Sequence, residues 1–353
     1  MQLNTKETVR ESLSKYPILQ KAFNKLTLRH IVQYTVAIIM LYAAWQFWDF
    51  LQYIRVSPTG DLPTRPPVVE GFLPIAAIVA LISFINTGII DPIHPAGLVI
   101  LLTALFTAWL FRRALCSWIC PIGTLSEHLA ALGRKIFGRN YAIPKWLDII
   151  LLIVKYGIFA YVIQMFLFMS ADDATSFMQL PYYAISDIKM FDFFTKISAV
   201  GIGVIVVFML LSMLFKSFWC RYLCPYGATL GLLGFLSPIV LTKNNDTCIK
   251  CGKCNQACPS CVDVMGKNRL VATTECNGCT SCVTACPKKG TLEFKFLGFL
   301  PIKPRYFGIG FVVVFFGIIL WAKMTGHWES IVTLEQYQQL DAYMSGGFGG
   351  MMQ

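Results

Sequence analysis

Residues 248–259 (CIKCGKCNQACP) and 276–287 (CNGCTSCVTACP) repeat one pattern of four cysteines, the last of which precedes a proline. This spacing lets three thiolates hold one Fe4S4 cluster while the fourth reaches a neighbouring cluster. Zinc knuckles and a disulfide framework are the alternatives, but zinc pairs rarely have a fourth cysteine followed by proline, and disulfides need an oxidising compartment. The pattern assigns Cys248, Cys251, Cys254 and Cys286 to cluster I, and Cys276, Cys279, Cys282 and Cys258 to cluster II.

The rest of the 353-residue chain has the composition of a helical membrane protein, with 56% hydrophobic and 14% charged residues and a mean hydropathy of +0.60. A helix of roughly 20 apolar residues crosses a bilayer core of about 30 Å. The predicted fold is membrane α-helical, with about five transmembrane helices and a bacterial-type two-cluster ferredoxin module (α+β) inserted before the last one. The predicted spans are residues 31–53, 97–111, 147–169, 197–215 and 306–321. The short second span extends through Arg112 and Arg113 if their side chains snorkel to the interface.

Loop charge predicts the orientation, because Lys and Arg in short loops stay on the cytoplasmic side. Residues 1–30 and 112–145 are rich in basic residues, whereas residues 170–196 carry four Asp and two Lys. We therefore expect a multi-pass protein of the inner membrane. Its expected parts are a cytoplasmic N-terminal segment (1–30), a membrane domain (31–240), a cytoplasmic module (241–300), a last helix (301–322) and an outer tail (323–353). The acidic, glycine-rich tail predicts a loosely ordered terminus.

One further apolar stretch, residues 72–90, would invert the later loops if it crossed the membrane fully. Pro74, Asn86 and Gly88 within it, and Pro92 and Pro95 after it, favour a broken helix. Membranes tolerate broken helix only where protein or water satisfies the backbone. We expect a re-entrant or interfacial hairpin on the outer side, and a full sixth span is the alternative.

Four other cysteines lie in a second internal repeat. CSWICP at 116–121 recurs as CRYLCP at 220–225, 104 residues later, and each copy follows an apolar stretch. Each copy offers two thiols one helical turn apart, so a four-thiolate cluster site needs both copies. Two pairs of free buried thiols, or a redox-active dithiol, are the alternatives. We expect Cys116, Cys120, Cys220 and Cys224 to share one metal or cluster site, and Cys261 to be an inert thiol near cluster II.

Together, the paired membrane motifs and the tandem module resemble the NapH/NosR/CcoG group of membrane-bound polyferredoxins, over about residues 31–293 and twelve cysteines. The resemblance implies electron transfer between the membrane quinone pool and other redox subunits or carriers. The chain differs from each of the three kinds of protein in this group. It has no room for the flavin-binding outer domain of NosR-like proteins or for the immunoglobulin-like domain of CcoG-like proteins. NapH-like proteins usually end soon after the ferredoxin, so the partner enzyme stays unassigned.

A quinol gives up two protons while clusters take electrons singly, so its oxidation needs a proton acceptor beside an apolar slot. Ionisable residues at membrane depth are the first candidates. Asp91 and His94 are the outer pair, and Glu127 and His128 are the inner pair. The alternative roles are a helix cap for Asp91 and a solvated helix face for the inner pair.

Other cofactors and partners fit the sequence less well. The chain has no Cys-x-x-Cys-His haem motif and no phosphate-binding glycine loop, and its four histidines lie at span ends or outside the spans. The net charge of +11 gathers near the predicted membrane, which anionic lipid explains better than nucleic acid.

Two functions stay open at this point. One is a quinol dehydrogenase-type oxidoreductase subunit that passes electrons through an interfacial cysteine site and two [4Fe-4S] clusters. The other is a copper reductase or an assembly factor for a respiratory metalloenzyme, because methionine and histidine in the tail could bind Cu(I). The tail residues concerned are Met324, His327, Met344, Met351 and Met352.

Overall fold

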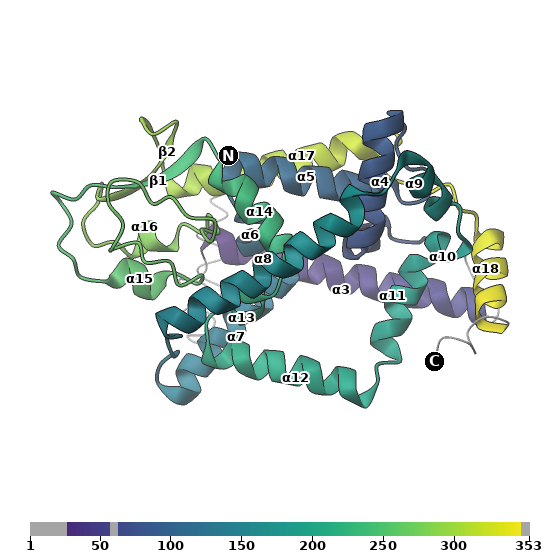
Figure 1. Ribbon diagram of the computed structural model, residues 1–353, viewed down its shortest axis with the longest axis horizontal. Helices are drawn as coiled ribbons and strands as arrows, with labels where there is room; N and C mark the ends of the chain where they lie inside the picture. The colour runs from purple at the N-terminus through teal and green to yellow at the C-terminus, as the bar shows by residue number, and fades with distance from the viewer. Residues whose placement is uncertain (1–26, 57–62, 347–353) are drawn as a thin grey trace, which may run out of the picture.

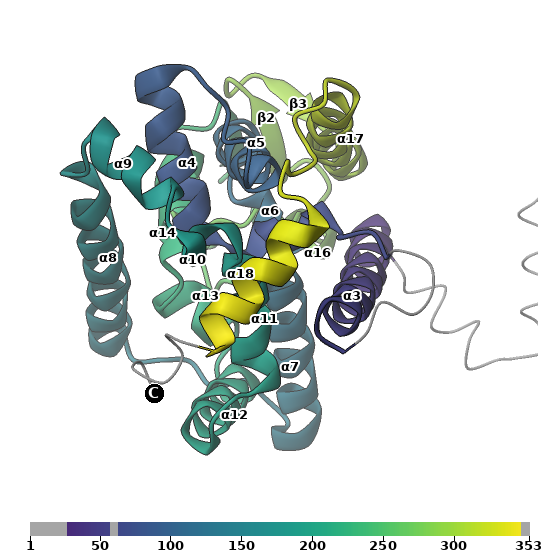
Figure 2. The same cartoon turned by 90° about the vertical axis from the view of Figure 1, so that its right-hand side faces the viewer.

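The computed structural model describes residues 27–56 and 63–346, and this part of the chain is mostly helical with one small sheet. Figure 1 shows long helices running along the longest axis, with the sheet at one end and α18 at the other. Figure 2 looks onto the second end, where α18 crosses in front of the other helices. The helices are α3 (Leu28–Arg55), η1 (Pro67–Phe72), α4 (Pro74–Thr87), α5 (Pro95–Phe111), α6 (Ala114–Trp118), α7 (Pro121–Phe137), α8 (Lys145–Leu167), α9 (Ala171–Met178), α10 (Pro181–Ala184), α11 (Ser186–Thr195), α12 (Ala199–Leu214), α13 (Phe218–Tyr222), α14 (Pro225–Phe235), α15 (Lys253–Ala257), α16 (Ser281–Ala285), α17 (Pro304–Met324) and α18 (Leu334–Gly346). The strands are β1 (Ile239–Lys243), β2 (Leu292–Phe296) and β3 (Leu300–Ile302).

Three described helices, α3, α8 and α17, are long and apolar enough to cross a membrane, and α11 with α12 makes a fourth candidate that is bent by 81°. Large apolar side chains such as Ile38, Ile153 and Val200 project outward from α3, α8 and α12, as lipid contact requires. The predicted second span, α5, has only 17 residues, which is about 26 Å of helix. The structure therefore offers three to four candidate spans, and the predicted count of five stays a prediction.

The stretch predicted as a hairpin folds as the 14-residue helix α4, which ends at Gly88 in the left-handed conformation (φ +72°). About 21 Å of helix is too short to cross a bilayer core of about 30 Å. The helix packs against α5 and α9 near the end of the molecule that carries α18 (Figure 1). This helix is not among the candidate spans, and the re-entrant or interfacial hairpin stays a prediction.

The internal repeat is confirmed as a structural repeat. In each copy a long apolar helix (α5 or α12) leads to a five-residue helix (α6 or α13) and then to a helix that begins at the proline of the motif (α7 or α14). The amide of Cys120 donates to the carbonyl of Leu115 at 2.9 Å, and that of Cys224 donates to Trp219 at 3.1 Å. The helix therefore breaks between the two cysteines of each copy, so the expectation of two thiols on one continuous helical turn was wrong.

The ferredoxin module contains an antiparallel sheet of order β1-β2-β3. Leu241 pairs with Phe294 in this sheet, and Phe294 stacks on Phe307 of α17 with ring centroids 4.8 Å apart. Trp118 of α6 belongs to the same buried cluster. The core of the module is thus continuous with the ends of the long helices, which fixes the module against them. The sheet begins at Ile239 and ends at Ile302, slightly beyond the predicted limits of 241–300 on both sides.

The described part of the tail is ordered, so the prediction of a loose terminus was wrong for residues 334–346. Tyr337 of α18 is buried against Phe50 of α3, with ring centroids 5.6 Å apart. Asp341 pairs with Arg55 at 2.8 Å, which adds a charged contact to the apolar one. Composition alone did not reveal this docking because the partners come from the other end of the chain. Residues 347–353, which include Met351 and Met352, lie outside the described residues.

Candidate functional site

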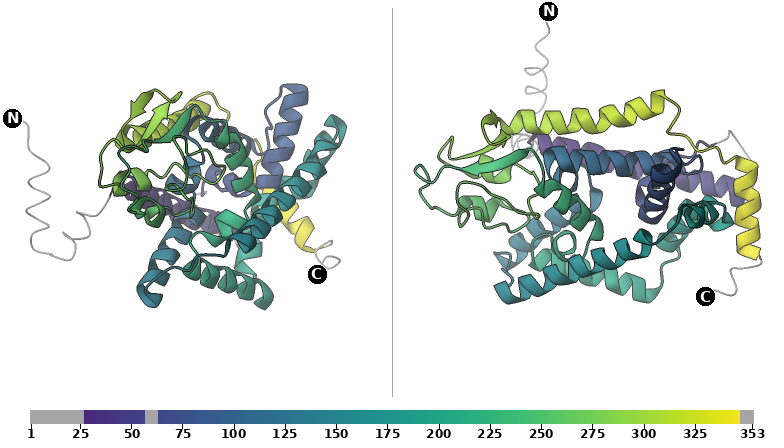
Figure 3. Two further views of the ribbon diagram at one scale, coloured as in Figure 1. Left: turned by 60° about the vertical axis from the view of Figure 1, so that its left-hand side comes forward. Right: turned by 45° about the horizontal axis from the view of Figure 1, so that its top comes forward.

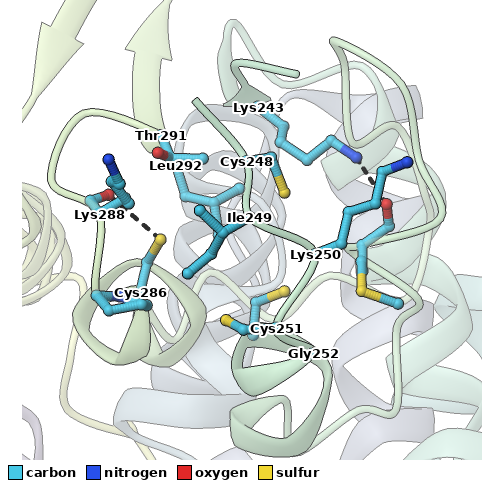
Figure 4. Close-up of a pocket in the computed structure, with 13 residues that line it drawn as sticks. Lys243, Cys248, Ile249, Lys250, Cys251, Gly252, Cys286, Lys288, Thr291 and Leu292 are labelled. Carbon is cyan, nitrogen blue, oxygen red and sulfur yellow. Dashed lines mark hydrogen bonds between the residues drawn. The ribbon is translucent and has the colours of Figure 1, made fainter. Parts of the chain in front are cut away.

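The four cysteines predicted for cluster I come together around one pocket of the module (Figure 4). Two loops supply them. Cys248 and Cys251 precede α15, Cys254 lies in its first turn, and Cys286 follows α16. Cys251 is exposed, so this pocket opens toward solvent. The buried side chain of Lys243 also lines it, and its Nζ donates to the carbonyl of Met265 at 2.6 Å.

The four cysteines predicted for cluster II line a second cavity, and apolar side chains from the module core complete its wall. Burial raises the pKa of the Cys258 thiol to about 12, and the neighbouring thiol of Cys279 adds to this rise. Each cavity therefore contains three cysteines of one motif and the last cysteine of the other. The cysteines of the second cavity are Cys258, Cys276, Cys279 and Cys282.

The two cysteine loops have the same backbone conformation, 28 residues apart. Lys250 and Gly278 are left-handed with φ of +53° and +57°, and Gly252 and Thr280 are left-handed with φ of +72° and +62°. The amide of Cys258 donates to Asn255 and that of Cys286 donates to Val283, both at 3.3 Å. These paired turns explain how three closely spaced thiols in each loop face one cavity.

Cys116, Cys120, Cys220 and Cys224 come together from the two repeats. Burial raises the pKa of the Cys120 thiol to about 12. The nearby thiols of Cys116 and Cys224 also raise it, by less than burial does. Burial and then the other three thiols raise the pKa of Cys220 well above its usual value. Buried thiols so close to one another stay protonated unless a positive metal centre stabilises their charge. This donor set fits a metal cluster that supplies such charge.

Each repeat packs tightly around its first cysteine. A Cβ at Gly123 would lie 2.0 Å from the carbonyl oxygen of Cys116, and one at Gly227 would lie 3.2 Å from that of Cys220. Glycine therefore lets the helix after the motif approach the cysteine backbone in both copies, at matching positions. Sequence pattern alone pointed to these glycines only as part of the repeat.

A single metal ion and an iron-sulfur cubane differ in how close together their protein ligands lie. Among residues 27–56 and 63–346, no three His, Cys, Asp or Glu side chains lie close enough together to hold one ion. The ligands of one zinc ion crowd around a single atom, whereas those of a cubane bind separate iron corners and stand farther apart.

A buried ionic triad of Arg113, Lys155 and Glu275 joins the membrane cysteine site to the module. Arg113 donates to a carboxylate oxygen of Glu275 at 2.9 Å and to the carbonyl of Cys220 at 3.3 Å. Lys155 reaches the other carboxylate oxygen at 2.6 Å. Burial alone would raise the pKa of Glu275, but Arg113 and Lys155 lower it below its usual value. Because Glu275 directly precedes Cys276, the triad connects the surroundings of two cysteine sets.

Other basic and aromatic side chains at the helix ends bind backbone carbonyls of the module. Arg112 donates to Val271 at 3.2 Å, and the indole of Trp118 donates to Gly278 at 3.2 Å. Arg221 binds the carbonyl of Ser260. Arg112 and Arg113 are 2% and 1% exposed, so the expectation that they snorkel to the interface was wrong. Both side chains instead bind the module, Arg112 at the carbonyl of Val271 and Arg113 at Glu275.

The inner pair of proton-transfer candidates lies near the middle of α7. Glu127 binds Arg29 at 2.5 Å and lines a cavity between α7 and the module. Burial alone would raise the pKa of Glu127, yet Arg29 lowers it. His128 turns elsewhere and contacts the hydroxyl of Tyr34 at 2.8 Å and the carbonyl of Thr124 at 2.8 Å.

The outer pair lies in a buried polar network near the α18 end. Asp91 accepts hydrogen bonds from the hydroxyl of Tyr183 and from the amide of Ile93. The N-cap of α5 is His94, so Asp91 does not cap that helix as the alternative interpretation expected. His94 approaches the carbonyl of Tyr183 at 2.7 Å and Glu70 at 3.5 Å. Burial alone would lower the pKa of His94, but Glu70 raises it above its usual value. Both carboxylate oxygens of Asp91 and the Nε2 of His94 are thus used by protein contacts, whereas the buried Nδ1 of His94 has no hydrogen-bond partner among the described residues.

Sequence reasoning missed Lys155 and the network around Arg65. Lys155 was recognisable as a charged residue inside an apolar stretch, which is a functional signal by default. Arg65 is paired with Glu70 at 2.8 Å and with Asp187 at 2.7 Å. Nothing in the local sequence joins these three residues, since they come from different elements.

The tail residues predicted for copper have different surroundings. Met324 and His327 are exposed, whereas Met344 packs into the apolar cluster that contains Phe47 and Tyr337. Packing of this kind is sufficient to explain Met344. No described contact unites these three side chains as one site.

Comparison with known proteins adds an independent view of the same residues. A family model described as a 4Fe-4S binding domain matches residues 93–140 and again 198–243, which are the two copies of the structural repeat. A second family model, a 4Fe-4S dicluster domain, matches residues 241–287. No solved structure matches the chain.

Related proteins agree with these domains. YccM of Escherichia coli (strain K12), named as an electron transport protein, is 36% identical over 323 residues, which cover 90% of each chain. The ferredoxin-type protein NapH of the same organism is 25% identical over 289 residues, 74% of this chain and 86% of NapH. NapH of Haemophilus influenzae is 28% identical over 206 residues, 54% of this chain and 64% of NapH. The chain therefore belongs to the NapH-like polyferredoxins, which are ferredoxin-type electron transport proteins with 4Fe-4S domains.

Proposed function

We propose that this protein is a membrane-bound electron relay between the quinone pool and a redox partner. Three cysteine sets would form the relay: the four membrane cysteines first, then cluster II, then cluster I. When bound, [4Fe-4S] clusters supply one-electron transfer.

The observation that carries the proposal is the contact between the two repeats and the module. Glu275 is covalently joined to Cys276 and hydrogen bonded to Arg113, which in turn contacts the carbonyl of Cys220. A short path of bonded and hydrogen-bonded atoms therefore leads from the membrane cysteine set to the cluster II set. Cys251, in the cluster I set, is exposed on the open side of the module.

For the quinone we propose the inner end, beside the cavity that Glu127 lines. Arg134, Asn140 and Lys216 lie around the same cavity, and Cys258 forms part of its wall. The carboxylate of Glu127 could take a proton from a bound quinol once its contact with Arg29 opens. Asp91 and His94 lie just before the start of α5, at the opposite end of that helix from the cysteine motif, so they are less suited to deliver electrons to the proposed relay.

Replacing one proposed ligand tests the cluster assignment. We expect the purified chain to hold about twelve iron atoms, since each of three [4Fe-4S] clusters has four. Cys254→Ser should remove about four of them, with loss of one cluster signal in electron paramagnetic resonance. Cys261→Ser is the matched control and should keep all of them, because Cys261 is absent from the lining of both module cavities. Unchanged iron in Cys254→Ser would refute the assignment.

Reporter fusions test the proposed orientation in the inner membrane. The module and α18 lie at opposite ends of the helices (Figure 1). A reporter fused after Glu293 should therefore report cytoplasm, and one fused after Gln353 should report the outer side, in line with the loop charges. Equal signals would mean that α17 does not span, and reversed signals would mean that the charge argument fails.

A further inference from the structure

Four exposed lysines lie in the two loops that supply the cluster I cysteines, and we call them the lysine rim: Lys250, Lys253, Lys288 and Lys289. Lys250 and Lys288 line the pocket itself and lie beside its cysteines in Figure 4. Within residues 27–56 and 63–346, none of the four lysines forms an ion pair. By contrast, Lys295 of the same module pairs with Glu293 at 3.8 Å. The rim therefore presents free positive charge at the open side of the pocket.

The iron-sulfur motif itself does not require lysine at these positions. The equivalent positions in the other loop, 28 residues away, hold Gly278, Ser281, Ser260 and Cys261. A Cβ at Gly278 would lie 2.9 Å from the carbonyl oxygen of Phe111. The carbonyl of Ser260 is bound by Arg221. The long helices thus cover the cluster II side, and lysine occurs where the same fold faces solvent.

Charge around the rim is mainly positive. Residues 243–254 and 286–290 contain five lysines, of which Lys243 is buried, and one acidic residue, Asp246, while Asp263 and Glu293 approach the same loops at Asn255 and Gly290. A field of this sign attracts an acidic surface and raises its association rate by about 10-fold to 1,000-fold at low salt. The module that carries the rim forms the end of the molecule beyond the helices (Figure 3). With the long helices in the membrane as proposed, this end projects beyond them, where a soluble protein can reach it.

We propose that the lysine rim docks an acidic electron-transfer protein, which exchanges electrons with the module beside Cys251. This proposal rests on the proposed function, since it needs cluster I at the pocket. One electron leaves the centre of one protein and enters the centre of the other. One protein is oxidised as the other is reduced, and no bond forms or breaks.

Two forms of one probe protein test this. Native cytochrome c is basic and fully succinylated cytochrome c is acidic, and both accept one electron. The full chain in detergent is first reduced with dithionite, freed of excess reductant, and then mixed with each oxidised probe in a stopped-flow instrument. At low ionic strength we expect the acidic form to oxidise the reduced protein at least about tenfold faster than the basic form does. The difference in rate should decrease as the salt concentration rises.

Charge reversal locates the docking site. Lys250→Glu combined with Lys288→Glu should remove the preference for the acidic probe. The control combines Lys135→Glu with Arg139→Glu, which makes the same change in net charge at exposed positions near the end of α7. This control should keep the preference for the acidic probe. Equal losses in both double variants would mean that overall charge acts and the rim does not, which overturns the proposal.

Cluster signals are measured first in every sample. An unmodified chain without a cluster I signal would refute the proposed function, whereas intact clusters with equal rates for the two probes would refute docking alone. Binding to vesicles of anionic lipid is the competing explanation. If the rim variant loses vesicle binding but keeps its preference for the acidic probe, the rim is a lipid contact and the proposal fails.

Discussion

Replacing Cys120 with serine is expected to slow quinol-driven reduction of the module's clusters by at least about 100-fold, while dithionite still reduces them. Cys120 is one of four thiols that the two repeats bring together, and a four-thiolate centre needs all of its ligands. Dithionite reaches the module directly from water, so it bypasses the membrane site. The measurement is anaerobic stopped-flow absorbance of the clusters with each reductant in turn.

The fold should survive this change. Cys120 is the N-cap of α7, and serine is among the most favourable N-cap residues. Cys261→Ser is the matched thiol-to-hydroxyl control and should keep full quinol-linked reduction. If Cys120→Ser also keeps it, with the metal content of the parent, the four membrane cysteines are structural and the relay runs elsewhere.

Cysteine spacing predicted much of the site because each iron-sulfur loop is locally encoded. Both sets of four module cysteines surround their own cavities, and the repeat carrying Cys116 and Cys220 folds twice in the same way. Apolar length located α3, α8 and α17 to within a few residues. The helix starts differ from the predicted ones because prolines at the first helical position, such as Pro95 and Pro304, set them, and hydropathy does not.

Long-range ionic contacts could not be predicted in this way. Lys155 and Glu275 are 120 residues apart, and Arg55 and Asp341 are 286 residues apart. Neither pair leaves a periodic signal in the sequence. Arg112 was expected at a lipid interface because the sequence does not show that the module covers this helix end. Tertiary contacts of this kind decide where buried charge is tolerated.

Opposite shifts in reduction potential are expected when the two ends of the buried triad are neutralised. With its three groups charged, the triad carries one net positive charge near Cys276 and Cys220. A unit charge at about 10 Å and an effective dielectric of about 20 is worth roughly 1.7 kcal/mol, or on the order of 50–100 mV for one electron. Lys155→Met should lower the potential of the nearest centre by about this amount. Glu275→Gln should raise it, because two cations then lack their carboxylate.

Potentials are read from redox titrations followed by electron paramagnetic resonance, which separates a charge effect from simple disruption of the fold. Glu275→Gln should also lower thermal stability by about 3–5 kcal/mol, since it leaves buried charge unpaired, whereas Lys155→Met keeps the pair between Arg113 and Glu275. Lys189→Met is the control, because Lys189 contacts Asp341 at the opposite end of the molecule. A shift of the same sign in both triad variants, or an equal shift in the control, would contradict an electrostatic role for the triad.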